Sequence, residues 1–237
     1  SCLTNRCGGR HGRPDPEHAL AKTKENRRVK RKDRILDAAE ALFAKHGFDG
    51  VSMRMVAVKA EVDLALASYH FGNKRGLFDA ILLRRAGVLN QTRLEALEKC
   101  QQEAGEAGPT VEAIIDAYLK PLLAFGYEED EGWRHYFELV AQVNNSPEWG
   151  GQLMTKYFDP LARRFMDALK KALPDSEPQN LYWAYHFLSG ALTLTFANTG
   201  RIDKLSDGIA RSKDMVGAYE RMVPFITAGF MQICTKK

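Results

Sequence analysis

Residues 67–78, ASYHFGNKRGLF, decide how the N-terminal part of this chain is interpreted. Tyr69, His70 and Phe71 stand directly before Gly72, and a basic pair follows before apolar residues resume. Glycine after an apolar run is typical of a helix C-terminus, and Asn73 is a preferred N-cap residue. The stretch therefore predicts the end of one helix and the start of another, whose free backbone N–H groups suit an anion.

The residues upstream predict two more short elements before this break. From Asp33 the apolar residues follow helical spacing, namely Ile35, Leu36, Ala39, Leu42 and Phe43. Gly47 is expected to end that helix, Ser52 to cap a second one, and Asp63 to cap a third, LALASYHF. Two short helices joined by a tight turn form a helix-turn-helix, whose later helix enters the DNA major groove.

The rest of the chain also has helical spacing and lacks an alternating strand pattern of useful length, so the predicted fold class is all-α. A fourth helix is expected from Lys74 to about residue 101, and others at 110–126, 131–145, 149–173, 179–199 and 213–234. We predict three parts: a disordered basic arm at 1–31, a helix-turn-helix DNA-binding domain at 32–80, and a larger effector-binding and dimerisation domain at 81–237.

Composition limits the partners. The 237 residues carry a net charge of +4, of which residues 1–34 contribute +7 and the remainder −3. A basic leading end on a mildly acidic body points to an anionic partner, although a solvated tail is an equal alternative. The four cysteines are scattered and form no disulfide framework, which favours a reducing cytoplasm.

Several functional classes find little support. Cys2, Cys7, His11 and His18 have irregular spacing for zinc, so we expect no metal and no cofactor. The uncharged stretch between Glu177 and Arg201 approaches a membrane span in length, but its polar residues and the lack of a second such segment favour a buried helix. Catalytic motifs such as HExxH, GxSxG and a CxxC pair are absent, so we expect no enzyme.

Residues 34–81 resemble the DNA-binding domain of the tetracycline-repressor (TetR) family, and YHFGNKRGLF is the most specific part of that resemblance. Members of that family are all-α homodimers that bind operator DNA and usually a small effector. The resemblance implies DNA contacts by eight residues: Ser52, Arg54, Leu64, Ala65, Ser68, Tyr69, His70 and Lys74. This chain departs from the family pattern at Glu61, where glycine is common in the turn, and at Ser68, where tyrosine is common.

The C-terminal half is rich in aromatic residues at helical spacing. Such stripes are usually core, but together they suit an apolar effector cavity. The candidate effector residues are Trp133, Tyr136, Phe137, Asn144, Tyr157, Phe158, Trp183, His186 and Phe187. Segments 148–174 and 182–201 resemble a subgroup of the family whose effectors include fatty acyl compounds.

The helices near 179–199 and 213–234 carry apolar faces larger than one domain needs, and the resemblance implies that they join two subunits. The leading hypothesis is a homodimeric repressor that binds a palindromic double-stranded DNA operator and is released by a largely apolar small molecule. The alternatives are a DNA-binding regulator without an effector, and a helical enzyme.

Overall fold

The chain is folded into helices, and across residues 16–125, 131–146 and 150–235, which the computed structural model describes, no strand is present. The helices follow one another along the chain as α1 (Pro16–His46), α2 (Met53–Lys59), α3 (Leu64–Phe71), α4 (Lys74–Ala104), η1 (Gly105–Ala107), α5 (Val111–Leu119), η2 (Lys120–Phe125), α6 (Glu131–Asn144), α7 (Gly150–Tyr157), α8 (Asp159–Ala172), α9 (Pro178–Phe196), α10 (Arg201–Leu205) and α11 (Met215–Cys234). The all-α prediction is confirmed.

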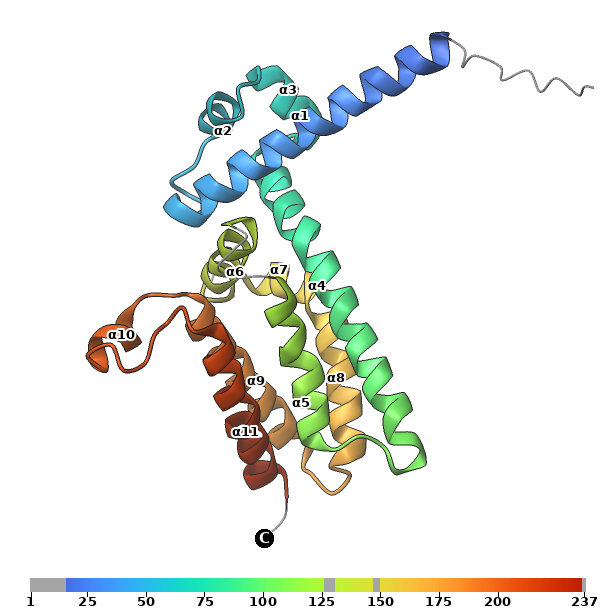
Figure 1. Cartoon of the computed structure of the whole chain (residues 1–237), viewed down its shortest axis with the longest axis vertical. Coiled ribbons are helices and arrows are strands. Elements are labelled where there is room, and N and C mark those ends of the chain that lie inside the picture. The colour runs from blue at the N-terminus through green and yellow to red at the C-terminus, as the bar shows by residue number, and fades with distance from the viewer. Residues whose placement is uncertain (1–15, 126–130, 147–149, 236–237) are drawn as a thin grey trace, which may run out of the picture.

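Helix α1 begins at Pro16, so the prediction that residues 1–31 form a disordered arm is wrong for residues 16–31. Proline is favoured in the first turn of a helix, and the residues after it are mostly strong helix formers such as alanine, lysine, glutamate and arginine. In Figure 1 this part of α1 projects beyond α2 and α3. Residues 1–15, with the zinc candidates Cys2, Cys7 and His11, lie outside the described residues.

Three other boundaries differ from the prediction. The helix expected at 149–173 is two helices, α7 and α8, that meet at Phe158, because Pro160 lies in the first turn of α8. The helix expected at 110–126 changes to a 3₁₀ helix at Lys120, next to Pro121. Helix α10 was not predicted; it lies between α9 and α11.

Helix α4 connects the two halves of the molecule (Figure 1). Its N-terminal end packs against α1 and α3, and its remainder runs beside α5 and α8. Helix α6 packs across α1, so one continuous hydrophobic core extends from Ile35 in α1 to Cys234 in α11. Within the described ranges, none of the helices has both the length and the apolar character that crossing a bilayer requires.

Candidate DNA-facing surface and inner cavity

The helix-turn-helix has the local signals that its sequence predicted. The Ser52 hydroxyl accepts a hydrogen bond from Met55 N at 3.2 Å, and Asn73 Oδ1 accepts one from Gly76 N at 2.9 Å, so both residues cap their helices. Gly72 ends α3 in the left-handed region at φ 71°. Asp63 stands at the N-cap of α3, but its side chain makes no capping bond.

The turn between α2 and α3 keeps a left-handed residue although glycine is missing there. Glu61 has φ 53°, a conformation that costs an L-residue about 1 kcal/mol or more. Arg34 from α1 donates to the Ala60 and Glu61 carbonyls and lies 3.2 Å from Glu61 Oε2. These bonds support the turn in this chain, where Glu61 stands in place of the glycine that is common in the family.

Six of the eight predicted DNA-contact residues are exposed on this unit: Ser52, Arg54, Leu64, Ala65, Ser68 and Tyr69. Ala67 of α3 is fully buried and Phe71 packs against the core, so the opposite side of α3 is fixed to the domain. The exposed side is small or apolar apart from Ser68 and Tyr69. It suits thymine methyl contacts and shape readout more than bidentate hydrogen bonds to bases.

The other two predicted contacts, His70 and Lys74, are half-buried. The ammonium of Lys74 donates to the Phe48 carbonyl at 3.0 Å and lies 4.4 Å from the centre of the Phe48 ring. Lys74 therefore ties α4 to the loop after α1. This contact uses one of its three N–H donors, and its phosphate contact stays a prediction. The centre of the His70 ring lies 5.4 Å from that of Tyr69 and 6.0 Å from that of Phe71.

A buried ion cluster joins α1 to α4 beneath this surface. Glu40 is 3% exposed and accepts hydrogen bonds from Arg84 Nη2 at 2.6 Å and from Arg85 Nε at 2.7 Å. Asp37 adds a bond to Arg84 Nη1 at 2.8 Å. Burial alone lowers the pKa of Arg84, but the hydrogen bond to Asp37 and the charges of Glu40 and Asp37 raise it above its ordinary value. Arg85 also lies 5.0 Å from the ring centre of Trp133 in α6.

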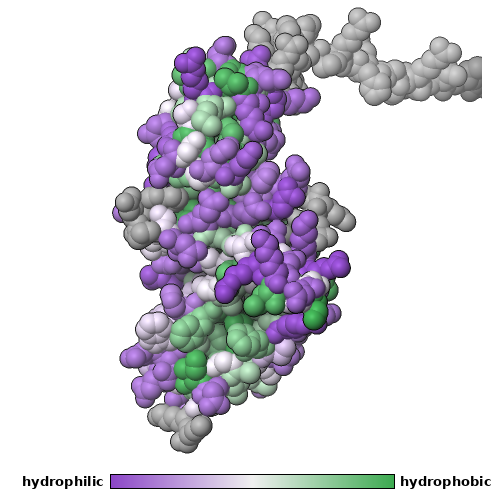
Figure 2. All heavy atoms as spheres, turned by 90° about the vertical axis from the view of Figure 1, so that its left-hand side faces the viewer, coloured by the Kyte–Doolittle hydropathy of each residue, from purple (hydrophilic) through white to green (hydrophobic). Residues whose placement is uncertain are grey.

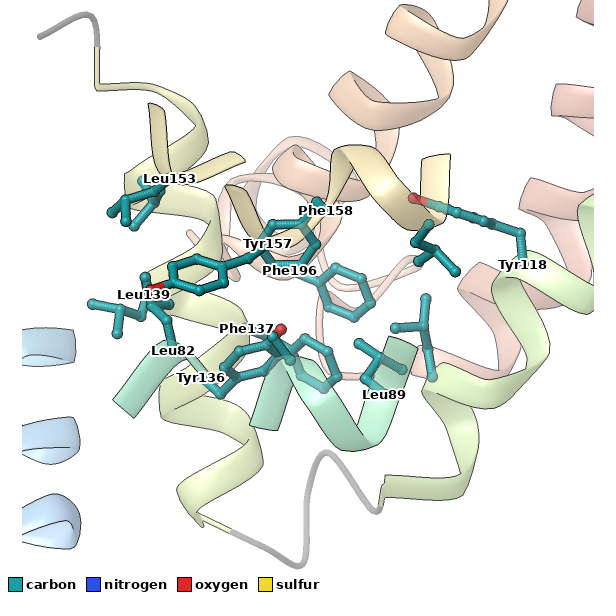
Figure 3. Close-up of a cluster of buried hydrophobic side chains, with 14 of the residues drawn as sticks. Leu82, Leu89, Tyr118, Tyr136, Phe137, Leu139, Leu153, Tyr157, Phe158 and Phe196 are labelled. Carbon is teal, nitrogen blue, oxygen red and sulfur yellow. The ribbon is translucent and has the colours of Figure 1, made fainter. Parts of the chain in front are cut away.

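An aromatic cavity lies inside the C-terminal half, between α4, α5, α6 and α9. It has about 550 Å³ of space free of protein atoms, part of it open to solvent. Phe137 and Phe196 stack in its wall with ring centres 4.4 Å apart, and Phe158 lies beside them (Figure 3). A mostly apolar cavity with a few polar groups is the usual form of a small-molecule site.

Four of the nine predicted effector residues line this cavity: Tyr136, Phe137, Asn144 and Phe158. Asn144 Nδ2 donates to Thr193 Oγ1 at 2.6 Å, so its amide is already oriented. The Tyr136 hydroxyl is buried and has no hydrogen-bond partner among the residues that the structure describes. Burial raises the pKa of Tyr136 well above its ordinary value, so the hydroxyl keeps its proton.

The other five predicted effector residues do not line this cavity. Trp133 packs on Phe125 with ring centres 4.0 Å apart, and Tyr157 lies with Leu139 and Leu153 on the far side of the aromatic cluster (Figure 3). The remaining three are exposed on the outer face of α9: Trp183, His186 and Phe187. The apolar residues of α9 have the helical spacing that the sequence predicts, but they lie on two faces of the helix, and only one face points to the core.

Five polar residues of the cavity are not among the predicted effector residues: Arg93, Tyr118, Tyr185, Ser189 and Thr193. The two tyrosine hydroxyls lie 3.4 Å apart, and Arg93 Nε donates to the Tyr118 carbonyl at 2.8 Å. A signal for Arg93 was present, because it continues the buried stripe of α4 between Leu89 and Leu97, four residues from each. A charged residue on an otherwise apolar helix stripe indicates a buried charge, which is rare in proteins unless the charge is paired.

Helices α9 and α11 also leave a large apolar face uncovered. Phe187 is 54% exposed and Phe225 is 73% exposed. Other exposed members of this face are Tyr182, Trp183, Leu194, Val216 and Met231. Figure 2, which views the side where Figure 1 places α9 and α11, shows apolar atoms gathered over this part of the molecule. Patches of this kind mark interaction sites.

Two family models match the chain, one in each half. Residues 35–81 match bacterial regulatory proteins of the tetR family, and residues 116–229 match the tetracyclin repressor-like C-terminal domain. Over 117 residues the chain is 26% identical to IcaR, the HTH-type negative transcriptional regulator of the biofilm operon icaADBC in Staphylococcus aureus (strain Newman). That alignment covers 49% of this chain and 55% of IcaR, so the chain spans about half the length of the curated relatives it matches.

Solved structures share the fold. The fatty acid degradation regulator FadR from Bacillus halodurans superposes with a TM-score of 0.56 at 16% identity, covering 84% of this chain and 95% of FadR. HlyIIR, a hemolysin II transcriptional regulator, superposes with a TM-score of 0.54 at 18% identity, covering 84% and 98%. At these identities the likeness is one of fold, and it extends over both halves of the chain.

Proposed function

Because this chain belongs to the TetR family of transcriptional regulators, we propose that it is a homodimeric cytoplasmic repressor that leaves its operator when a small molecule enters the C-terminal cavity. The members of this family regulate transcription and are not enzymes. The observation that carries the proposal is the helix-turn-helix, in which residues implied to contact DNA are exposed on α2 and α3 while the opposite side of α3 is fixed to the core.

A dimer is proposed because one recognition helix reads only half of a palindromic site. Two copies must place their α3 helices about one DNA turn apart, roughly 34–36 Å. The exposed apolar face of α9 and α11 supports pairing through these helices, as the sequence predicted for 179–199 and 213–234. Isologous contacts of the same face on both copies give the two-fold symmetry that a palindrome requires.

Release by an effector is supported by the cavity and by the position of α4. This one helix carries Leu89 and Arg93 in the cavity wall and Arg84 and Arg85 in the ion cluster with α1. A ligand that shifts α4 changes the spacing of the two α3 helices, and a coupling of about 1–3 kcal/mol is enough to release DNA usefully. A regulator without an effector is the second candidate; the cavity favours the first.

Repression rather than activation is proposed from IcaR, a negative regulator. The test is selection of bound duplexes from a random pool, followed by titration of the best duplex at several salt concentrations. Arg54→Ala removes one exposed cation of α2, and we expect it to weaken binding and to reduce the salt slope by about 1. Arg164→Ala is the matched control, because Arg164 is an exposed arginine of α8 in the other half.

Sedimentation of the same samples gives the number of chains on each duplex. Two chains on a palindromic duplex, with a steep salt dependence, support the proposal. Recovery of no preferred duplex, or equal loss of binding in both variants, contradicts it. Lys74 is a poor choice for this test, because its bond to Phe48 O makes any substitution a change in stability as well.

A further inference from the structure

Arg93 is a buried charge without a counter-ion. It is 4% exposed and lies in the wall of the cavity between Leu89 and Tyr118. Its guanidinium lies over the Tyr118 ring, 4.1 Å from the centre, and Nε donates to the Tyr118 carbonyl. Across the described residues no carboxylate pairs with it, and Nε–H is the only one of its five N–H donors that is hydrogen-bonded.

A buried cation without a counter-ion destabilises the fold unless another group neutralises its charge. Moving a cation out of water carries a penalty of several kcal/mol, which is repaid when an anion with good geometry pairs with the cation. A carbonyl and an aromatic face offset part of this penalty. The planar fork of arginine matches the two oxygens of a carboxylate, and in an apolar cavity that pairing is stronger than in water.

Tyrosines in the cavity wall also carry phenolic hydroxyls that can donate hydrogen bonds to the same anion. Tyr136 is 1% exposed and lines the cavity, and its buried hydroxyl has no hydrogen-bond partner in the described part of the chain. Tyr185 is half-buried beside Tyr118, and desolvation raises its pKa above the ordinary value. Both groups therefore keep their protons at neutral pH and remain donors. Two hydroxyl donors and one guanidinium suit an oxyanion, whereas a cationic head group finds no acid in the cavity wall.

We propose that the cavity takes an apolar molecule with one carboxylate, whose oxygens accept hydrogen bonds from the guanidinium of Arg93 and from the hydroxyl of Tyr136. The inference rests on the proposed function, because it names the chemical class of the effector. The apolar body lies among the side chains of Phe137, Phe158 and Phe196. The anionic end then neutralises the charge of Arg93, which α4 places in the core.

The test compares acids with their isosteric primary amides by calorimetry on the full chain. The two pairs of probes are decanoate with decanamide, and 4-phenylbutanoate with 4-phenylbutanamide. At least one acid is expected to bind at least 10-fold more tightly than its amide. Arg93→Met should weaken that acid 10- to 100-fold and its amide less than 3-fold, and Arg93→Lys should lie between because it keeps the charge without the fork. Arg164→Met, on the surface of α8, should bind as the wild type does.

The ratio of acid to amide affinity within one variant is the deciding quantity, because a partly unfolded sample lowers both affinities alike. Tyr136→Phe leaves Arg93 in place and should lower the ratio 3- to 10-fold. Equal binding of acids and amides, an unchanged ratio in Arg93→Met, or no binding by either acid overturns the proposal.

DNA titrations with the same probes separate this inference from the proposed function. An amide that binds and releases DNA as well as its acid overturns the anionic class and leaves the ligand-released repressor intact. An acid that binds through Arg93 without releasing DNA supports the ligand class and contradicts effector control.

Discussion

Replacing Glu40 with alanine removes the shared anion of the ion cluster between α1 and α4. Glu40 is 3% exposed and is bound by Arg84 at 2.6 Å and by Arg85 at 2.7 and 3.2 Å. Deleting one partner of a buried ion pair costs about 3–5 kcal/mol, because the opposite charge stays behind without compensation. The two arginine side chains are 25% and 16% exposed and so reach some water. The lower end, about 3 kcal/mol, is therefore expected.

Asp37 provides a matched control within the same cluster. It binds Arg84 at 2.8 Å, a distance like that of Glu40, but its side chain is 66% exposed. An exposed pair contributes at most about 1 kcal/mol. The two acids differ in burial and in bonding, because Glu40 accepts three hydrogen bonds from two arginines and Asp37 accepts one. Their substitution therefore compares the buried, shared anion with the exposed one.

Urea unfolding of Glu40→Ala, Glu40→Gln and Asp37→Asn, all at one protein concentration, gives the three free energies of unfolding. Glu40→Gln keeps the shape and loses the charge, so about 1.5–3 kcal/mol is expected. Asp37→Asn should cost less than about 1 kcal/mol. Equal losses for Glu40→Ala and Asp37→Asn would refute the argument, because they would mean that burial of the cluster carries no energetic consequence.

Two further predictions concern α4 and α11. Gly76→Ala should destabilise the protein in thermal unfolding, because its Cβ would collide with the Phe71 carbonyl. In the same helix, the Cβ of Gly87→Ala meets no atom, and this variant should be more stable by up to about 1 kcal/mol. A loss of stability in both variants would contradict this. Burial and the hydrogen bond to Asp116 raise the pKa of Tyr219 to about 12. The unfolded chain releases this proton near pH 10, so stability should fall between about pH 10 and 12. That fall should be smaller in Tyr219→Phe, and equal slopes would exclude the effect.

Local chemistry explains why the helix-turn-helix was predictable from the sequence. Helices begin at Ser52 and Asn73 through capping side chains, and α3 ends at Gly72 through the backbone freedom of glycine. The sequence within a few residues of each position is therefore enough to predict its role. The same holds for Phe71, whose inward packing follows from helical spacing. Glu61 shows the limit, because its left-handed backbone is hydrogen-bonded by Arg34, 27 residues away in sequence.

The cavity was harder to predict, because spacing shows that a helix has an apolar stripe but does not show what covers it. On α9 the stripe with Leu188 and Phe196 faces the core, whereas the one with Trp183 and Phe187 is exposed. Both have the same period in the sequence. Only the packing of α9 between α11 and α6 separates the two, and that packing depends on contacts between distant segments.

Two arginines of α4, the half-buried Arg85 and the buried Arg93, are charged exceptions among its inward-facing residues. Arg85 and Arg93 are eight residues apart, roughly 12 Å along the helix axis. Arg85 is held by Glu40 of α1, whereas Arg93 has no counter-ion in the described chain. One rigid helix thus carries a satisfied charge at the DNA-binding half and an unsatisfied one at the cavity. In the ligand site proposed above, a carboxylate paired with Arg93 would act on the same helix that Glu40 anchors, and this pairing would connect the cavity to the DNA-binding half.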